Sequence, residues 1–321
     1  MPSDMQEKSF IHLRVHTEYS IQDGMIRIDE MMDAAARDNM PAVAITDSMN
    51  LFAVVKHYKT AIQHGIKPII GCEVQVQYEN DATKLYSLVL LCMTPEGYRN
   101  LTELISLAFE KGQIQGKPRI YIDWIKNHHQ GLIALSGAAL GDIGQSILSD
   151  NLVQAKSYIQ QWQQIFENRF YLEIQRLGYD YDSKLNQQVI QFADEFQLPL
   201  VATNSACFIE KNDFEAHEAR VCIHQGRVLA DSGRPKSHTE EQYLKSQREM
   251  CELFVDLPQA LKNSIEIAKR CNVPLVLGKS YLPNFPTPNE MPVEAYLKQT
   301  AEQGLLKRLP YVSGKYSHDI Y

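Results

Sequence analysis

Phe10–Gly24 reads Phe-Ile-His-Leu-Arg-Val-His-Thr-Glu-Tyr-Ser-Ile-Gln-Asp-Gly, an apolar run followed by a loop of polar and ionisable side chains. Residues two apart in a β-strand point to the same face of a sheet, so His12, Arg14 and His16 are expected on one side. A His-x-His pair at this place would offer two imidazole ligands to a metal ion. The middle of the three positions is instead taken by Arg14, a permanent cation with no lone pair to offer a metal ion. The stretch therefore predicts the first strand of the fold and a site that is either a working or a retired metal centre.

The length and charge of the chain limit its class. At 321 residues it is long enough for one barrel-sized domain, or for a domain with an appendage. Its 44% hydrophobic and 22% charged residues are ordinary for a globular protein. A net charge of -7 argues against a broad electrostatic grip on a nucleic-acid backbone, which requires clustered Lys and Arg.

The cysteines and the N-terminus indicate the compartment. The six cysteines show no Cys-x-x-Cys spacing and no short disulfide framework, so we interpret them as reduced thiols. Residues 1–9 form a polar tail that lacks the apolar core of a signal peptide. No apolar run approaches the ~20 residues that cross a bilayer. These features predict a cytoplasmic protein with no membrane partner.

Short apolar runs alternate with longer amphipathic ones, which is typical of strand–helix units around a parallel sheet. The predicted strands are Phe10–Val15, Ala42–Ile45, Lys67–Val76, Leu85–Cys92, Leu132–Leu135, Phe170–Ile174 and Leu198–Ala202. The predicted helices between them are Asp29–Asp38, Leu51–His64, Gly97–Lys111, Leu152–Phe166 and Asp182–Phe196. Seven strands with intervening helices fit a closed barrel better than an open sheet, although periodicity alone does not decide between them.

Polar side chains follow several of these strands. In α/β barrels the C-terminal ends of the strands face the active site. The side chains expected to converge at one mouth are His16, Asp23, Asp47, Glu73 and Asn204. For any one such residue the alternative is a local role, in which Asp47, Asn50 or Ser136 caps a helix or ties down a loop.

The character of the chain changes beyond Phe208. The predicted helices there are Asp213–Gln225, Thr239–Leu244, Glu249–Phe254 and Pro258–Cys271. A proline-punctuated stretch with Pro283, Pro286, Pro288 and Pro292 resembles a linker. One more amphipathic helix, Val293–Leu309, follows it and indicates that the chain continues in the natural protein. The predicted organisation is a polar tail over 1–9, one domain over 10–280, and a linker with a first helix over 281–321.

The other candidate motifs do not indicate a catalytic or ligand-binding site. There is no Walker loop, Rossmann fingerprint or Gly-x-Ser-x-Gly elbow, and Gly137–Gly144 lacks the Lys-Ser/Thr of a phosphate loop. His217 and His224 lie seven apart on one predicted helix, with no third ligand nearby in the sequence. Packing or a surface role is the better interpretation of both.

Three motifs carry a specific resemblance. His12-Leu-Arg-Val-His-Thr-Glu-Tyr-Ser, Ala44-Ile-Thr-Asp-Ser and Pro68-Ile-Ile-Gly-Cys-Glu resemble the PHP (polymerase and histidinol phosphatase) domain. Gly97-Tyr-Arg-Asn-Leu and Gly131-Leu-Ile-Ala-Leu-Ser-Gly make it similar to the PHP domain at the N-terminus of bacterial DNA polymerase III alpha subunits, in particular the proteobacterial branch. The resemblance implies an α/β fold, a (β/α)7 distorted TIM-like barrel with additional C-terminal helices, whose last helix leads into a polymerase module.

The resemblance also implies where a metal site would lie. Family members that keep the site use nine ligands: His-x-His, Asp, His, Glu, His, Cys and Asp-x-His in chain order. In this chain the nine positions carry Arg14, His16, Asp23, Ser48, Glu73, Ser87, Ala138, Ser205 and Cys207. Only His16, Asp23 and Glu73 match, while Cys207 is a substituted residue that is still able to ligate. We hypothesise that Arg14 replaces the metal as an internal cation paired with Asp23, Glu73 or Asp47.

The resemblance implies a function without catalysis in this chain. The expected role is a scaffold for the polymerase module and a docking surface for the proofreading exonuclease (epsilon) subunit, with DNA contacted only through the full-length holoenzyme. No cofactor is expected here, and Mg²⁺ only in the full-length polymerase. The alternative is an active metal-dependent PHP phosphoesterase or 3′–5′ exonuclease. Polymerisation by this chain itself is not expected, because no clustered Asp-x-Asp follows Tyr281.

Overall fold

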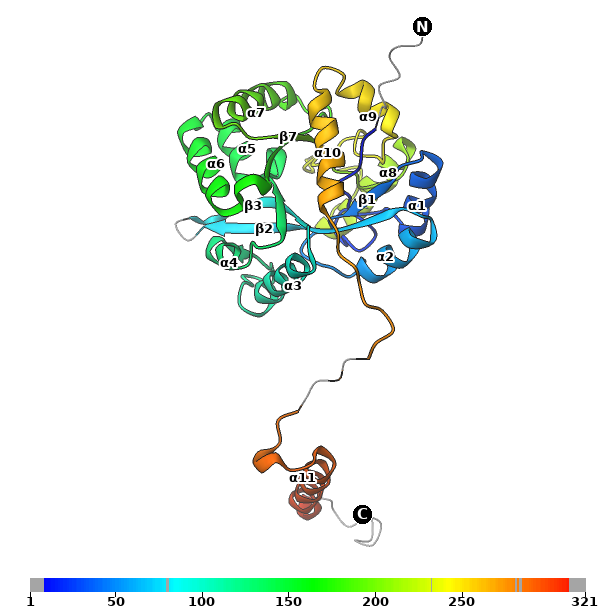
Figure 1. Cartoon of the computed structure of the whole chain (residues 1–321), viewed down its shortest axis with the longest axis vertical. Helices are drawn as coiled ribbons and strands as arrows, with labels where there is room; N and C mark the ends of the chain where they lie inside the picture. Colours follow the sequence, from blue (N-terminus) through cyan, green and yellow to red (C-terminus); the bar gives the residue numbers. More distant parts are fainter. Residues whose placement is uncertain (1–8, 79–80, 232, 281, 283–284, 312–321) are drawn as a thin grey trace. The chain divides into compact units, whose positions relative to one another are not determined.

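The computed structural model describes residues 9–78, 81–231, 233–280, 282 and 285–311. It divides into two compact units, the first ending at Leu275 and the second beginning at Val276 (Figure 1). Each unit is described by itself below. Among the helices of the described residues, none combines the length and the apolar character that a bilayer crossing requires.

The first unit is built on a seven-stranded mixed sheet. Its strands are β1 (Ala42–Ile45), β2 (Lys67–Tyr78), β3 (Asp81–Cys92), β4 (Ile120–Tyr121), β5 (Leu132–Leu135), β6 (Phe170–Ile174) and β7 (Leu200–Ala202). They run in the order β1-β2-β3-β5-β6-β7, with β4 paired to the far end of β2. The predicted parallel sheet is mixed instead, because β3 is antiparallel to both β2 and β5. β2 and β3 are long neighbouring strands with a direct connection, so they form a hairpin rather than a crossover unit.

The segment before β1 joins the two edges of this sheet. On one side the Ala44 amide donates to His12 O and the Thr46 amide to Val15 O, both at 2.9 Å. On the other side the His16 amide donates to Ala206 O at 2.8 Å. The predicted strand Phe10–Val15 is therefore extended and hydrogen-bonded to both edges. It is not a regular strand, because a side chain replaces one backbone partner: the Val15 amide donates to Thr46 Oγ1. These bonds close the sheet into a distorted barrel.

Helices surround the barrel and bury one face each. They are α1 (Ile28–Arg37), α2 (Val54–Gln63), α3 (Pro95–Glu110), α4 (Ile122–Asn127), α5 (Asp142–Leu148), α6 (Leu152–Phe166), α7 (Asp182–Phe196), α8 (Phe214–Gln225), α9 (Gln247–Leu253) and α10 (Pro258–Arg270). In α1 the buried residues Ile28, Met31, Met32 and Ala35 follow the i, i+3, i+4, i+7 spacing of one helix face. The sequence analysis missed α4, α5 and β4, which are short.

One predicted helix is absent from the described residues. Thr239–Leu244 is irregular: Tyr243 forms a bridge with Phe208, and the Leu244 amide donates to Phe208 O at 2.9 Å. The Cys207 amide donates to Gln242 O at 2.8 Å. Pairing with the chain after β7 thus replaces the helical bonds, which places this segment beside the barrel mouth.

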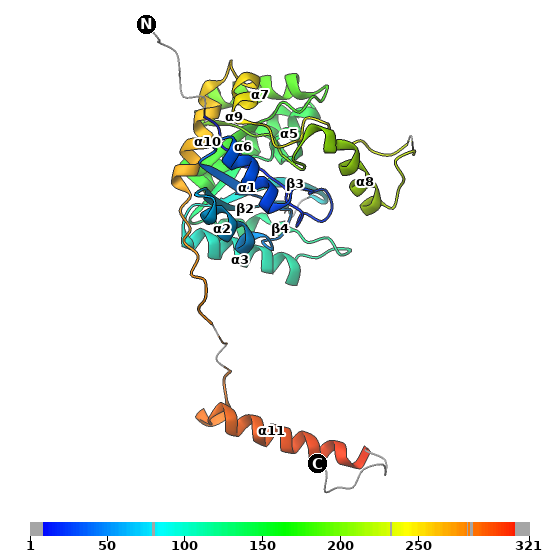
Figure 2. The same ribbon diagram turned by 90° about the vertical axis from the view of Figure 1, so that its right-hand side faces the viewer.

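The barrel is closed by packing at one end. Ala42 and Ala44 of β1 face an inner cluster with Ile69, Leu91 and Val201, and Val43 and Ile45 face the cluster shared with the helices. Ile267 and Ala268 of α10 join the inner cluster. Figure 2 shows α10 at one end of the barrel and α8 at the other. The apolar end is therefore plugged by α10, and polar side chains collect at the opposite end.

The second unit contains α11 (Val293–Arg308), preceded by a 3-10 turn at Pro288–Glu290 and followed by another at Leu309–Tyr311. No side chain of α11 is buried. The predicted helix Val293–Leu309 is thus confirmed to within one residue.

Candidate functional site

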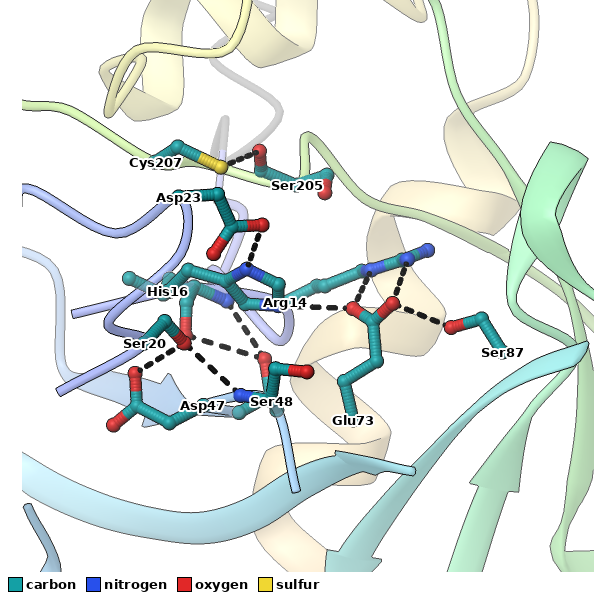
Figure 3. A network of polar contacts seen from close by, with 12 residues as sticks. Arg14, His16, Ser20, Asp23, Asp47, Ser48, Glu73, Ser87, Ser205 and Cys207 are labelled. Carbon is teal, nitrogen blue, oxygen red and sulfur yellow. Dashed lines mark hydrogen bonds and ion pairs between the residues drawn. The ribbon is translucent and has the colours of Figure 1, made fainter. Parts of the chain in front are cut away.

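Arg14 lies between two buried carboxylates, those of Glu73 and Glu173, and Figure 3 shows its contact with Glu73. Its side chain is only 2% exposed. Its Nε donates to Glu73 Oε2 at 2.9 Å, and its Nη2 lies 2.9 Å from Glu73 Oε1. Its Nη1 donates to both carboxylate oxygens of Glu173 at 3.2 Å. The guanidinium therefore binds the Glu73 carboxylate in a bidentate manner, and its Nη1 donates a bifurcated hydrogen bond to Glu173. Lysine has no planar group that makes this bidentate contact.

His16 extends this network toward Asp23. It donates from Nδ1 to Asp23 Oδ2 at 3.0 Å and from Nε2 to Glu73 Oε2 at 2.9 Å. Burial disfavours the charged imidazole, but the carboxylates of Asp23 and Glu73 outweigh it and raise the pKa of His16 well above its ordinary value. Both ring nitrogens of His16 therefore carry protons that point at carboxylates.

The carboxylate of Glu73 accepts hydrogen bonds from three side chains. Besides Arg14 and His16, it accepts a hydrogen bond from Ser87 Oγ at 2.5 Å. Burial alone would raise the pKa of Glu73, yet the charges of Arg14 and His16 lower it to about 2. Glu73 is therefore an anion at every pH at which the fold is expected to operate.

Glu173 is a site residue that the sequence analysis missed. It lies on β6 and is 1% exposed. It accepts hydrogen bonds from Thr203 Oγ1 and from Gln175 Nε2, the latter at 3.0 Å. A signal was present, since an acidic residue within the apolar strand Phe-Tyr-Leu-Glu-Ile requires a buried partner.

Two of the three carboxylates expected on Arg14 bond elsewhere. Asp23 contacts His16, as described above. Asp47 accepts from the Thr17 amide at 2.7 Å and from Ser20 Oγ at 2.9 Å, so it ties two loops together. Of the three alternatives predicted for the partner of Arg14, the structure shows Glu73 and neither Asp23 nor Asp47. For Asp47 the loop-tying alternative is correct. The reason is that the Thr17 amide and the Thr17 and Ser20 hydroxyl groups occupy the Asp47 carboxylate.

Asn50 and Asn204 also hold loops. Asn50 Nδ2 donates to Tyr19 O at 3.0 Å. Asn204 Nδ2 donates to Tyr243 O at 2.7 Å and to Glu241 O at 3.1 Å. Asn204 thus fixes the irregular segment that borders the mouth rather than facing Arg14.

Seven of the nine family positions line one small cavity of about 90 Å³. They are Arg14, His16, Asp23, Glu73, Ala138, Ser205 and Cys207. Ser87 contacts this cluster through its hydrogen bond to Glu73. Ser48 lies at the border of the cluster, where its amide donates to Ser20 Oγ at 2.9 Å. The nine positions therefore converge in space.

Two histidines outside these positions lie beside Cys207. His217 of α8 and His238 each place one ring nitrogen within 4.8 Å of Cys207 Sγ and of each other. The sequence offered no third ligand near His217 because His238 and Cys207 are distant along the chain. His224, seven residues further along α8, is exposed.

Comparisons with known proteins place this chain in a family. A family model described as the PHP domain matches residues 12–177, more than half of the chain. The DNA polymerase III subunit alpha of Pseudomonas aeruginosa is 46% identical over 97% of this chain and 26% of its own length. The subunit of the same name from Escherichia coli K12 is 42% identical over 96% of this chain and 26% of its own length. The chain thus spans about a quarter of the length of the curated relatives it matches.

A solved structure of an amidohydrolase from Chromobacterium violaceum superposes with a TM-score of 0.42 at 14% identity, covering 66% of this chain and 97% of the other. A likeness at this level says nothing about chemistry. The family model and the proteobacterial relatives agree with the motifs at the barrel mouth, and this chain belongs to the PHP domain family.

Proposed function

We propose that this chain is the N-terminal part of a DNA polymerase III alpha subunit whose PHP domain has no hydrolytic activity. The domain serves as a scaffold for the polymerase module and as a docking surface for the proofreading exonuclease (epsilon) subunit. The observation that carries the proposal is the guanidinium of Arg14 held between Glu73 and Glu173. The relatives named DNA polymerase III subunit alpha support the identity of the parent protein.

The loss of hydrolysis follows from the donor chemistry at the nine positions. Metal-assisted phosphoester cleavage requires neutral imidazoles and free carboxylates that fix ions and generate hydroxide. Here both carboxylate oxygens of Glu73 face Arg14, and both nitrogens of His16 face carboxylates. The remaining positions carry hydroxyl, methyl or thiol side chains at Ser48, Ser87, Ala138, Ser205 and Cys207. These residues do not fit the multi-metal centre of the family, and Arg14 supplies positive charge where the ions would sit.

The scaffold role is supported by what the network connects. Arg14 comes from the segment that closes the barrel, Glu73 from β2 and Glu173 from β6. Ser87 of β3 and Thr203 beyond β7 add hydrogen bonds to the two carboxylates. One buried cation therefore holds strands that are distant in sequence in a single arrangement.

The wider context of the proposal concerns the whole subunit. The parent protein polymerises DNA with Mg²⁺ in its own module, contacts DNA through the holoenzyme and works in the cytoplasm. No catalytic cofactor is assigned to this chain. None of its six cysteines forms a disulfide in the described residues, which is compatible with a reducing compartment.

Hydrolysis assays test the inactivity. We expect no turnover of p-nitrophenyl phosphate or of DNA 3′ ends above the protein-free background, with Mn²⁺ or Zn²⁺ added. A variant that restores the family ligands, with Arg14→His, Ser48→His, Ser87→His, Ala138→Cys, Ser205→Asp and Cys207→His, is the matched comparison. Metal-dependent turnover by the natural sequence would favour the active phosphoesterase or exonuclease and sink the proposal.

A binding titration tests the docking role. We expect the chain to bind the purified exonuclease subunit, measured by calorimetry. Exposed apolar side chains on two neighbouring loops are the proposed contacts: Ile21 is 70% and Phe52 67% exposed, and the Asn50–Tyr19 hydrogen bond joins their loops. Replacing both by Asp is expected to weaken binding at least tenfold, because apolar anchors dominate interfaces. Val153→Asp on α6, where the side chain is 83% exposed, is the control and should leave affinity unchanged. No binding by the natural chain would refute the docking role.

A further inference from the structure

We propose that Cys207, His217, His238 and Asp23 form a zinc-binding site. The site combines two of the nine family positions with two histidines that lie outside them. It does not depend on the proposed function, because a metal held by these four side chains would stabilise loops rather than cleave phosphoesters.

The four residues come from four separate segments. Asp23 lies in the loop before α1, Cys207 follows β7, His217 lies on α8, and His238 lies in the segment that leads to Gln242. One donor atom from each of Cys207, His217 and His238 lies within 4.8 Å of the other two. Donor atoms of Asp23 and Cys207 also lie within 4.8 Å of each other. Donor atoms this close to one another are compatible with convergence on one ion, since zinc ligands lie roughly 2.0–2.3 Å from the metal.

His217 has the hydrogen-bonding pattern of a metal ligand. It is fully buried, and its Nε2 lies 2.8 Å from the backbone oxygen of Asp23, to which it donates. Its Nδ1 has no hydrogen-bond partner among the described residues. Metal-binding histidines typically donate the non-ligating N–H to a backbone carbonyl or a carboxylate. A buried acceptor without a partner is costly, and a metal ion at Nδ1 would remove that cost.

Asp23 has a second unused acceptor. Its Oδ2 accepts from His16, whereas its buried Oδ1 has no partner among the residues that the structure describes. His238 faces the same carboxylate, with its Nε2 3.9 Å from Asp23 Oδ2. The other nitrogen of His238, Nδ1, lies 3.1 Å from Ser237 Oγ. The His217 and His238 rings meet edge to face, with centroids 4.7 Å apart, so that their nitrogens approach one region.

The donor chemistry favours zinc. One thiolate, two imidazoles and one carboxylate form a borderline-soft set that suits tetrahedral Zn²⁺. Cys207 thiolate and Asp23 carboxylate together balance the two positive charges of the ion. Four protein ligands leave no open position for water, which is the arrangement of a structural site.

A competing set of donors shares the same cysteine. His16, Asp23 and Cys207 also place one donor atom each within 4.8 Å of one another. Both ring nitrogens of His16 already face carboxylates, at 3.0 Å and 2.9 Å. Both nitrogens of His16 are therefore occupied, whereas Nδ1 of His217 in the other set has no hydrogen-bond partner among the described residues.

Metal analysis of the untagged full chain tests the proposal. After dialysis against Zn²⁺ and then metal-free buffer, we expect about one zinc per chain by mass spectrometry. Replacing the zinc by Co²⁺ should give the visible bands of a tetrahedral ion and a thiolate-to-cobalt charge-transfer band. His238→Ala should weaken zinc binding at least tenfold and remove the dependence of the melting temperature on chelator. Its side chain is half-buried, so the variant is expected to fold.

The control is His224→Ala, which changes an exposed histidine of α8 and should retain both the zinc and the cobalt spectrum. Cys207→Ser should retain folding but lose the charge-transfer band. The proposal is overturned if the natural chain holds no zinc and gives no thiolate band. Zinc binding that survives unchanged in both His238→Ala and Cys207→Ser would equally reject this set of ligands.

Discussion

Replacing Arg14 by alanine is expected to lower the free energy of unfolding by about 3–5 kcal/mol. The reason is that Glu73 and Glu173, 4% and 1% exposed, would lose the guanidinium that both of them face. Removing one partner of a buried ion pair leaves an uncompensated buried charge. This destabilises the fold more than replacing both partners by apolar residues does. Urea unfolding monitored by circular dichroism measures the difference.

Two comparisons isolate the cause. Arg248→Ala removes an exposed ion pair with Glu252 and should leave the free energy of unfolding nearly unchanged, because solvent screens such pairs. Arg14→Met combined with Glu73→Gln and Glu173→Gln should recover part of the loss, because it removes the unpaired charges together. An unchanged melting temperature in Arg14→Ala would contradict the idea that this cation holds the barrel mouth.

Acidification from pH 7 to pH 4 is expected to destabilise the fold through its buried histidines, His12 and His57 among them. Burial lowers the pKa of His12 and of His57 from 6.5 to about 4. Between these values the unfolded chain binds a proton at each histidine and the folded chain does not. Stability is therefore lost as pH falls from 6.5 to 4, by up to about 3 kcal/mol for each histidine.

His57→Leu tests this dependence without ambiguity. His57 is fully buried on α2, and leucine places an apolar side chain of similar size there. The variant should lose less stability between pH 7 and pH 4.5 than the natural chain, measured by urea unfolding at each pH. His224→Leu changes an exposed histidine and should leave the dependence as it is. Equal slopes for His57→Leu and the natural chain would refute the assignment.

Another buried group acts in the opposite direction. Burial raises the pKa of Asp142 from 3.8 to about 6, against the hydrogen bonds that it accepts from Tyr78 and Trp162. The folded chain then retains a proton that the unfolded chain releases, so stability rises as pH falls from 6 to 3.8. The comparison of His57→Leu with the natural chain cancels this contribution, because Asp142 is present in both.

The pattern of the chain predicted most of the local structure. β1, β5 and β6 have the predicted bounds, and α6 and α7 are confirmed as Leu152–Phe166 and Asp182–Phe196. These elements carry their own signal, because buried strands are short apolar runs and amphipathic helices repeat with a period near 3.6. The direction of β3 was not predictable in this way, since side-chain periodicity is the same in parallel and antiparallel strands.

The motifs of the sequence identified the family and predicted which positions of a family metal site are substituted. Arg14, Ser48, Ser87, Ala138 and Ser205 are visible as departures in the motifs alone. Only the tertiary structure decided the partners of Arg14, which are Glu73 and Glu173 rather than Asp23 or Asp47. It alone also brought His217 and His238 to Cys207. Ion pairs and ligand sets depend on distances between segments remote in sequence, and those distances exist only once the barrel has closed.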